Sequence, residues 1–397
     1  MSTGTDTDVG TASAATQSAR DLPDITFDQV DWSEYETEGI DFTPILIAEI
    51  AAFGLLTGLF LYDYFVVPNG EATLTWPFVW DVTKLDYTFI LTVLGLFFHG
   101  VVPAYKNKRL TMYYWQEFKK NRAAVISLAY LGVLFVVGTV GPLLIEKPEL
   151  SFSTMTHPPV GITAAPTGEA ITGTWAHPLG TDQQGKDILK LMIFGARVSL
   201  EVGLIGMLIL IVIGTTVGAT AAFFGGLVDE VLMRYVDIQM TFPAFMLLLL
   251  FVYLFGGSLF MVILLYGVLS WEGTARLVRG EALQKREEPF MKAAKTFGAS
   301  NLYIIRNHLV PNVSRTVVTN ATLIIPGFII AEAGLSFLGL GDPDAISWGQ
   351  VISSGRSVLD SAPWIATIPG IALFVTILAF NFVGDAAQDA LDPRKSN

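Results

Sequence analysis

The stretch EEPFMKAAKTFGASNLYIIRNHLVP, residues 287–311, is a charged, helix-breaking interval between two long hydrophobic runs. Because the flanking runs are apolar enough to lie in a bilayer, this interval is expected to leave the membrane on one side. Pro289 suits the first position of a helix, and the carboxylates of Glu287 and Glu288 favour the positive end of the helix dipole. The sequence therefore predicts a short helix that begins at Pro289 and lies at a membrane surface.

Apolar residues recur along this predicted helix with helical spacing. The positions i, i+3, i+4 and i+7 are Phe290, Ala293, Ala294 and Phe297. Gly298 follows directly, as expected of a glycine that ends a helix in the left-handed conformation. A helix of this kind packs on the membrane domain, docks into a groove of another protein, or is an ordinary solvated helix between two spans.

The composition indicates a membrane protein. The chain has 397 residues, of which 52% are hydrophobic and 15% are charged, too apolar for a soluble domain of this size. It contains no cysteine, which excludes a disulfide framework and a thiolate metal site. The four histidines have no metal-ligand spacing: His99, His157, His177 and His308.

Eight hydrophobic runs are each long enough to cross roughly 30 Å of hydrocarbon. They lie near residues 43–67, 86–105, 122–145, 198–224, 239–256, 258–278, 313–334 and 363–384. Lys and Arg are concentrated after the second run and between the sixth and seventh, so we expect these intervals and both termini to face the cytoplasm. The predicted protein is therefore an all-α, multi-pass protein of the cell membrane.

The chain is predicted to have three parts. Residues 1–41 hold ten carboxylates and a single basic residue, Arg20, and form an acidic cytoplasmic tail of disordered composition. Residues 42–114 contain two spans and a basic linker, and residues 115–397 contain the other six, with a cytoplasmic loop at 280–312. The net charge of −12 also suits a cytoplasm of very high salt, as in a halophilic archaeon.

Three further sets of residues stand out between and within the spans. Asp182 and Asp187 are interpreted as caps of turns and helices, with cation ligation as the alternative. Gly214 and Gly218 form a small-xxx-small pair that favours close helix packing. Glu332, near the outer end of the seventh span, either lies on a transport pathway, caps the following turn, or pairs at a subunit contact.

Two intervals are expected to lack regular spans. Residues 225–238, which start with two glycines and carry four charges, are predicted to make a short cytoplasmic turn. The interval between the last two spans mixes glycines with apolar residues, which is typical of a partly re-entrant segment at the outer face.

The opening stretch resembles the "EAA" loop of permeases of ATP-binding-cassette (ABC) importers. The pair Ala293-Ala294, Gly298 and Pro311 fit the spacing of that loop, whereas Lys292 stands where the family usually has Glu. The resemblance implies that this helix is a coupling helix, which sits in a cleft of an ATPase subunit. The residues assigned to coupling are Glu288, Phe290, Ala293, Ala294, Phe297, Gly298 and Pro311.

Other segments resemble the C-type permease subunit of the dipeptide, oligopeptide and nickel branch of that family. They are WQEFKKNRAAVISLAYLGVLF at 115–135, HPLGTDQQGKDILKLMIFGARVSLEVGL at 177–204, AEAGLSFLGLG at 331–341, SWGQ at 347–350, APW at 362–364 and FNFVGDAAQDALDPR at 380–394. DPDAI at 342–346 departs from the Pro-rich form usual in the family. The resemblance implies a six-span, type I permease core, and the first two spans and the tail are expected to be dispensable for coupling.

The predicted function is a permease subunit of an ATP-driven importer of peptides. The chain lacks a G-x-x-x-x-G-K-[ST] phosphate loop, so it is not an enzyme, and partner subunits would bind ATP and Mg²⁺. The implied partners are a second permease, two ATP-binding subunits, an extracytoplasmic substrate-binding protein and membrane lipid, with no nucleic acid. Nickel or another small solute is the alternative cargo. An ion-driven secondary transporter is the alternative class. It would carry charged side chains at span centres, where the sequence places only Glu49 and His99.

Overall fold

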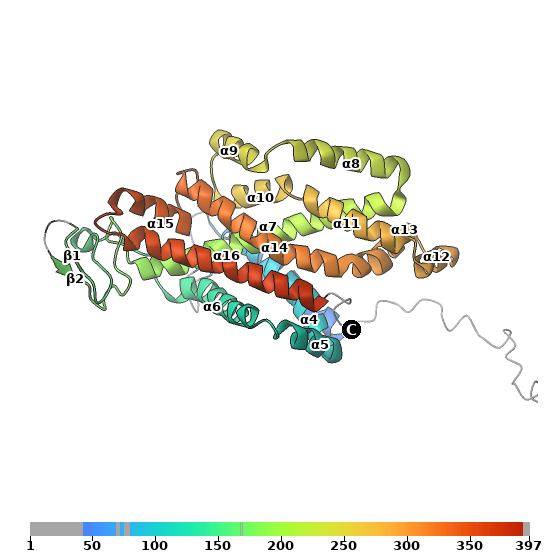
Figure 1. Ribbon diagram of the computed structural model, residues 1–397, viewed down its shortest axis with the longest axis horizontal. Coiled ribbons are helices and arrows are strands. Elements are labelled where there is room, and N and C mark those ends of the chain that lie inside the picture. Colours follow the sequence, from blue (N-terminus) through green and yellow to red (C-terminus); the bar gives the residue numbers. More distant parts are fainter. Residues whose placement is uncertain (1–42, 69–71, 75–79, 167, 169, 392–397) are drawn as a thin grey trace, which may run out of the picture. The chain divides into compact units, whose positions relative to one another are not determined.

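The computed structural model of the protein describes residues 43–68, 72–74, 80–166, 168 and 170–391 (Figure 1). The predicted acidic tail at 1–41 lies outside these residues. The chain divides into two compact units, Met1–Ala51 and Ala52–Asn397. The described residues of the first unit, 43–51, contain the start of helix α2 (Pro44–Val66).

The second unit is built almost entirely from helices. After the end of α2 these are α3 (Lys84–Leu96), the π-helical turn η3 (Phe97–Val101), α4 (Val102–Lys106), α5 (Lys108–Phe118), α6 (Arg122–Leu144), the 3₁₀ turn η4 (Phe152–Thr154), α7 (Ile188–Phe224), α8 (Gly226–Thr241), α9 (Ala244–Phe255), α10 (Leu259–Leu269), α11 (Glu272–Arg286), α12 (Pro289–Thr296), α13 (Asn301–Ile304), the π-helical turn η5 (Ile305–Leu309), α14 (Val310–Phe337), α15 (Trp348–Gly355), the 3₁₀ turn η6 (Arg356–Val358) and α16 (Trp364–Leu391). Two short antiparallel strands, β1 (Thr163–Ala164) and β2 (Ile171–Thr172), pair with Thr163 opposite Thr172.

The number of candidate spans agrees with the sequence prediction. Among the described residues, six helices are long and apolar enough to cross a membrane, and two bent helix pairs raise the possible number to eight. The bent pairs are α8 with α9, at 74°, and α10 with α11, at 40°. This confirms an all-α membrane protein, in which the fifth and sixth predicted spans correspond to the two bent helix pairs.

Residues 226–241 form helix α8, so the short turn predicted at 225–238 is wrong. Arg279 of α11 donates to both carboxylate oxygens of Asp229, at 2.5 and 2.6 Å, and Arg276 of α11 pairs with Asp237. The charges that suggested a solvated turn therefore have partners on a neighbouring helix. That neighbour could not be identified from local sequence.

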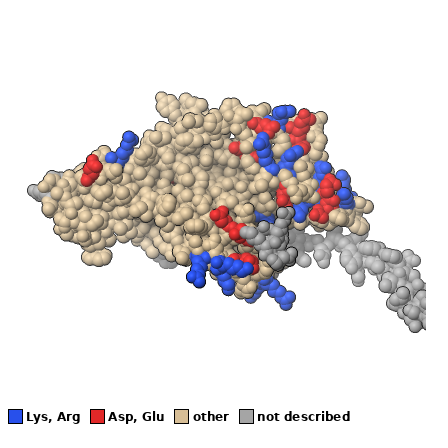
Figure 2. All heavy atoms as spheres, viewed as in Figure 1, with Lys and Arg blue, Asp and Glu red and all other residues tan. Residues whose placement is uncertain are grey.

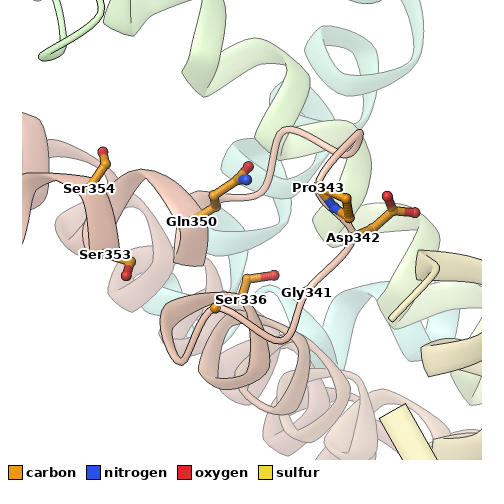
Figure 3. A pocket seen from close by; sticks show the side chains of 8 residues that line it. Ser336, Gly341, Asp342, Pro343, Gln350, Ser353 and Ser354 are labelled. Atoms are coloured by element: carbon orange, nitrogen blue, oxygen red, sulfur yellow. The ribbon is translucent and has the colours of Figure 1, made fainter. Parts of the chain in front are cut away.

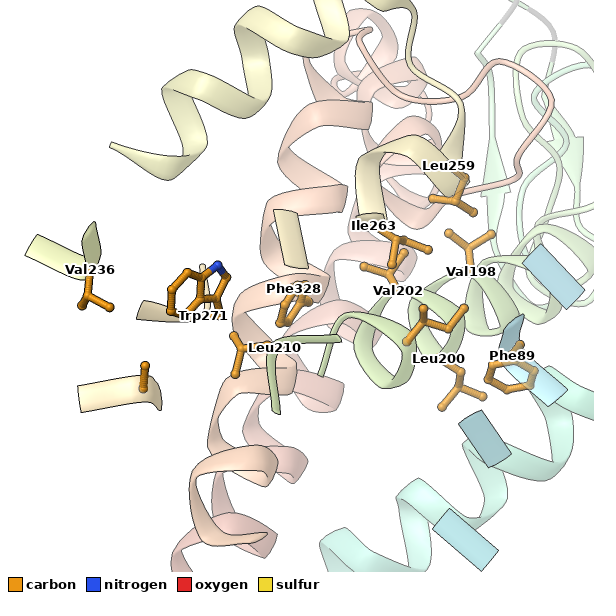
Figure 4. Packing of buried hydrophobic residues seen from close by; sticks show 12 residues of the cluster. Phe89, Val198, Leu200, Val202, Leu210, Val236, Leu259, Ile263, Trp271 and Phe328 are labelled. Atoms are coloured by element: carbon orange, nitrogen blue, oxygen red, sulfur yellow. The ribbon is translucent and has the colours of Figure 1, made fainter. Parts of the chain in front are cut away.

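Helix α7 lies at the centre of the membrane domain, with α6, α10, α11 and α14 packed around it (Figure 1). Its inner residues Val198, Val202 and Leu210 belong to a buried cluster that also contains Trp271, at the start of α11, and Phe328 of α14 (Figure 4). The segment that follows Asp187 is helical and continuous with the fourth predicted span, giving one helix of 37 residues.

The glycines of α7 allow α11 to approach closely, as the small-xxx-small pattern predicted. A β-carbon added at Gly218 would lie 2.4 Å from the carbonyl oxygen of Ala275, and one at Gly214 would lie 2.8 Å from Cβ of Thr274. These distances are too short for non-bonded atoms, so no larger residue fits without moving α11.

We predict that Gly218→Ala destabilises the membrane domain, because the added methyl group overpacks the contact with α11 at a typical cost of about 1–3 kcal/mol. Gly327→Ala in α14 is the matched control, because no atom lies within 4 Å of its added β-carbon. The thermal unfolding midpoint of the purified permease in detergent should fall for Gly218→Ala and not for Gly327→Ala. Equal midpoints would contradict the close packing.

Candidate functional site

Residues 289–296, within the charged interval 287–311, form the predicted short helix. Helix α12 begins at Pro289, with Glu288 as the residue before its first turn, and ends at Thr296. Proline is well placed there because its missing N–H would have had no partner within the helix. The carboxylate of Glu288 accepts no hydrogen bond from the backbone N–H groups of the first turn.

Gly298 closes α12 in the left-handed conformation, which confirms the sequence prediction. Its φ is +82°. The N–H of Gly298 donates to the carbonyl of Lys295 at 3.1 Å, and the N–H of Ala299 donates to the carbonyl of Ala294, also at 3.1 Å. This pair of bonds is the Schellman motif, which satisfies carbonyl groups at a helix end.

The two faces of α12 have different surroundings. Met291 is buried and Ala294 is half-buried, and both pack against a cluster formed by α7, α11, α13 and α14. On the other face Ala293 is exposed, Phe290 is 40% exposed and Phe297 is 89% exposed. The predicted stripe is therefore divided: Ala294 faces the chain itself, and the other three residues form an open apolar face.

Sequence reasoning missed Met291, the residue that anchors the helix. Its spacing to Ala294 is i, i+3, so the signal was present, but the alternative stripe through Phe290 contained more apolar residues. Lys292 lies 3.4 Å from the carboxylate of Glu287. The hydrogen bond and the charge of Lys292 together hold the pKa of Glu287 below its ordinary value.

Charged side chains gather around this end of the second unit (Figure 2). Figure 2 shows Lys, Arg, Asp and Glu over α8, α11 and α12, and a basic group at α5, whereas the middle of the visible face has almost none. An apolar face within a charged surrounding is unlike the lipid-facing surface of a span.

Pro311 lies in the first turn of α14, directly after the π-helical turn η5. Val310 closes η5 by donating to the carbonyl of Ile305. A proline ring clashes with the carbonyl one turn earlier, and the wider π turn accommodates this. Helix α13 therefore continues through η5 into α14, from Asn301 to Phe337, and joins the α12 region to a long span.

Glu332 is enclosed by its own chain, at 4% exposure. Its Oε1 accepts a hydrogen bond from the hydroxyl of Ser336 at 2.6 Å. Ser336 and Gln350 point into a cavity of about 300 Å³ that Asp342 and Pro343 also line (Figure 3). Glu332 thus lies behind this cavity and supports the turn after α14.

The two outer aspartates act as caps. Oδ1 of Asp182 accepts from the backbone N–H groups of Gln184 and Lys186, both at 2.8 Å, and Asp187 caps the first turn of α7. Burial raises the pKa of Asp182, although these backbone hydrogen bonds act to lower it. Among the described residues no group of three potential metal ligands is found.

A buried ion cluster links α3, the second of the two additional spans, to the core. Sequence reasoning missed this cluster. Arg197 of α7 pairs with Asp86 of α3, and its Nε donates to Glu201 at 2.8 Å. The side chains are 16%, 8% and 4% exposed, respectively. The guanidinium also lies 5.6 Å from the ring centre of Trp80. Asp86 and Arg197 are 111 residues apart, so no local pattern indicates the pair.

Comparison with known proteins gives two matching family models. The model for the binding-protein-dependent transport system inner membrane component matches residues 214–397. The model for the N-terminal transmembrane domain of oligopeptide transport permease C matches residues 110–159.

The chain is also similar to curated bacterial proteins. It is 37% identical over 287 residues to an oligopeptide transport system permease protein of Haemophilus influenzae, covering 70% of this chain and 88% of that protein. It is 35% identical over 282 residues to a dipeptide transport system permease protein of Bacillus subtilis, covering 70% and 84%. For the oligopeptide permease protein of Escherichia coli K12 the identity is 36% over 287 residues, covering 70% and 91%.

We predict that Arg197→Met strongly destabilises the permease. Removing this partner leaves two buried carboxylates uncompensated, which typically costs about 3–5 kcal/mol. The control is Arg276→Met, whose ion pair with Asp237 is half exposed and is expected to contribute about 0–1 kcal/mol. Thermal unfolding in detergent should separate the two variants. A midpoint for Arg197→Met as high as that of Arg276→Met would show that the buried cluster adds no stability.

Proposed function

The chain belongs to the family of binding-protein-dependent transport permeases, and from this premise we propose that it is a permease subunit of an ATP-driven ABC importer of oligopeptides or dipeptides. Its long apolar helices make it a multi-pass membrane protein. Family membership and the names of the relatives support peptide as cargo over nickel or another small solute. Family membership also disfavours an ion-driven secondary transporter. Glu201 and Glu272 lie inside candidate spans in addition to Glu49 and His99.

The observation that carries the coupling proposal is the open apolar face of α12. The helix is fixed to the chain by Met291 and Ala294, whereas Ala293 and Phe297 on the other side are exposed. Phe290 is 40% exposed, with its ring centre 6.4 Å from that of His308. Exposed apolar side chains on an anchored helix suit insertion into an apolar groove of a partner. We assign that partner as an ATP-binding subunit.

Movement of α12 would reach the spans through two connections. Residues Glu287 and Glu288 join it directly to α11, and α13 joins it to α14 through η5. Both α11 and α14 pack on α7. Closure of two ATP-binding subunits would thus re-orient the spans as packed bodies, giving alternating access.

The remaining partners complete the proposed importer. A second permease would form the other half of the path, and an extracytoplasmic binding protein would deliver the peptide. ATP and Mg²⁺ would be held by the ATP-binding subunits, since hydrolysis is not assigned to this chain. The distribution of Lys and Arg supports cytoplasmic termini, and the acidic surplus supports a source cell with a high-salt interior.

We predict that Ala293→Glu abolishes co-purification of the ATP-binding subunits, because the variant places an unpaired carboxylate in an apolar groove, at a cost of several kcal/mol. Lys292→Ala, one residue away, should retain them because its side chain is exposed and paired only with Glu287. Membrane levels of both variants should equal the wild type. Loss of the ATP-binding subunits in Lys292→Ala but not in Ala293→Glu would place the contact on another face.

We further predict that Gly298→Ala weakens coupling and that Gly298→Asn weakens it less. No atom lies within 4 Å of an added β-carbon, so the effect comes from the positive φ, which costs most side chains about 1 kcal/mol or more and Asn less. The measurement is substrate-stimulated ATP hydrolysis by the reconstituted complex, with assembly checked in parallel. Wild-type stimulation in Gly298→Ala would mean that the Schellman motif is not needed for coupling.

A further inference from the structure

Two broken helices meet inside the membrane domain. The α8–α9 pair is interrupted at Phe242-Pro243, and the α10–α11 pair at Ser270-Trp271. Helices α9 and α10 contain 12 and 11 residues, about 18 and 17 Å at 1.5 Å per residue. Both are shorter than the roughly 30 Å of a bilayer core, so neither crosses the membrane without the helix with which it is paired. At membrane depth, irregular backbone is tolerated where it is enclosed by protein or lines a water-filled path.

Gln239 joins the two breaks. Its Nε2 donates to the carbonyl of Val268 at 3.2 Å, and its distance to Oε2 of Glu272 is 3.4 Å. Val268 and Glu272 both offer acceptor oxygens, so the NH₂ group of the Gln239 amide must face them. Oε1 of Gln239 therefore points away from both. Oε1 is enclosed and has no hydrogen-bond partner among the described residues. The hydroxyl of Ser270 is also enclosed, with the hydroxyl of Tyr266 beside it.

Glu272 carries a negative charge at this place that has no basic partner. Among the described residues no Lys, Arg or His nitrogen lies within 4 Å of its carboxylate. Arg276, one helical turn later, pairs with Asp237 instead. The first turn of α11 favours an acidic side chain, but this does not explain the unpartnered oxygen of Gln239.

We propose that Glu272, Gln239 and Ser270 form a subsite that binds the ammonium group of the transported peptide. The three side chains offer acceptor oxygens and one net negative charge, and an ammonium group offers three N–H donors and one positive charge. This inference rests on the proposed function as a peptide permease. It adds that the cargo is recognised within the membrane domain by its amino end.

Neighbouring aromatic rings suit the same ligand. Trp271 is buried in the break, and Tyr235 of α8 stacks on it with ring centres 6.0 Å apart. Aromatic faces attract cations. Tyr235 is 57% exposed, so the subsite lies beside an open surface of α8, which a second permease subunit would cover.

The test uses the absence of cysteine from the chain. Ser270→Cys introduces a single thiol at the subsite of the complete complex in proteoliposomes. The probes are aminoethyl methanethiosulfonate, a cation, and sulfonatoethyl methanethiosulfonate, an anion, each normalised to its rate with a free thiol. During ATP turnover the cation should react about fivefold faster or more, because of the nearby carboxylate. The ratio should fall toward one when Glu272→Gln is added, and a dipeptide should slow the reaction.

The outcomes separate the inference from the proposed function. If the complex imports the dipeptide but the two reagents react equally, or the dipeptide gives no protection, the subsite is wrong and the permease function stands. If the wild-type complex imports no peptide, the proposed function fails. Ser199→Cys, a buried position within α7, should remain unmodified throughout and serves as the control for general opening.

Discussion

The close contact between α7 and α11 at Gly214 and Gly218 is the constraint on which the arrangement of the membrane domain depends. Without side chains at these two positions, α11 lies against the backbone of α7 along its C-terminal half. In lipid, where apolar burial between helices gives little net driving force, such close packing is a main source of stability. Helix α11 in turn positions α8, because its Arg276 and Arg279 form ion pairs with aspartates of α8. The end of α11 at Arg286 is followed after two residues by α12.

Local features of the chain could be predicted from the sequence because their causes are local. Pro289 and Gly298 define the two ends of α12 through backbone geometry alone, and the six long helices follow from the length of their apolar runs. The EAA-like spacing and the later motifs identified the family because they keep their order along the chain. The comparisons confirm that family.

Features that depend on distant partners could not be predicted. The charges of α8 predict a turn when read alone, and become compatible with a helix only when Arg276 and Arg279 are known to lie beside them. Arg197 and Glu201 have the i, i+4 spacing of an ordinary helical ion pair, which gives no indication of Asp86 on another helix. The division of the α12 stripe likewise depends on which of two overlapping faces meets α7 and α11, and Met291 decides this by packing, not by periodicity.

The ion cluster at Arg197 has a consequence for how the protein is made. Asp86 leaves the ribosome 111 residues before Arg197, an interval on the order of ten seconds at about 5–20 residues per second. During that time α3 must enter the membrane with a carboxylate whose final partner does not yet exist. Thr83 supplies hydrogen bonds to this carboxylate within the same turn. Its N–H and its hydroxyl both donate to Oδ2 of Asp86, at 2.8 and 3.0 Å. The capping box of α3 thus gives the carboxylate of Asp86 hydrogen-bond donors within its own turn, and α7 later supplies its charge partner.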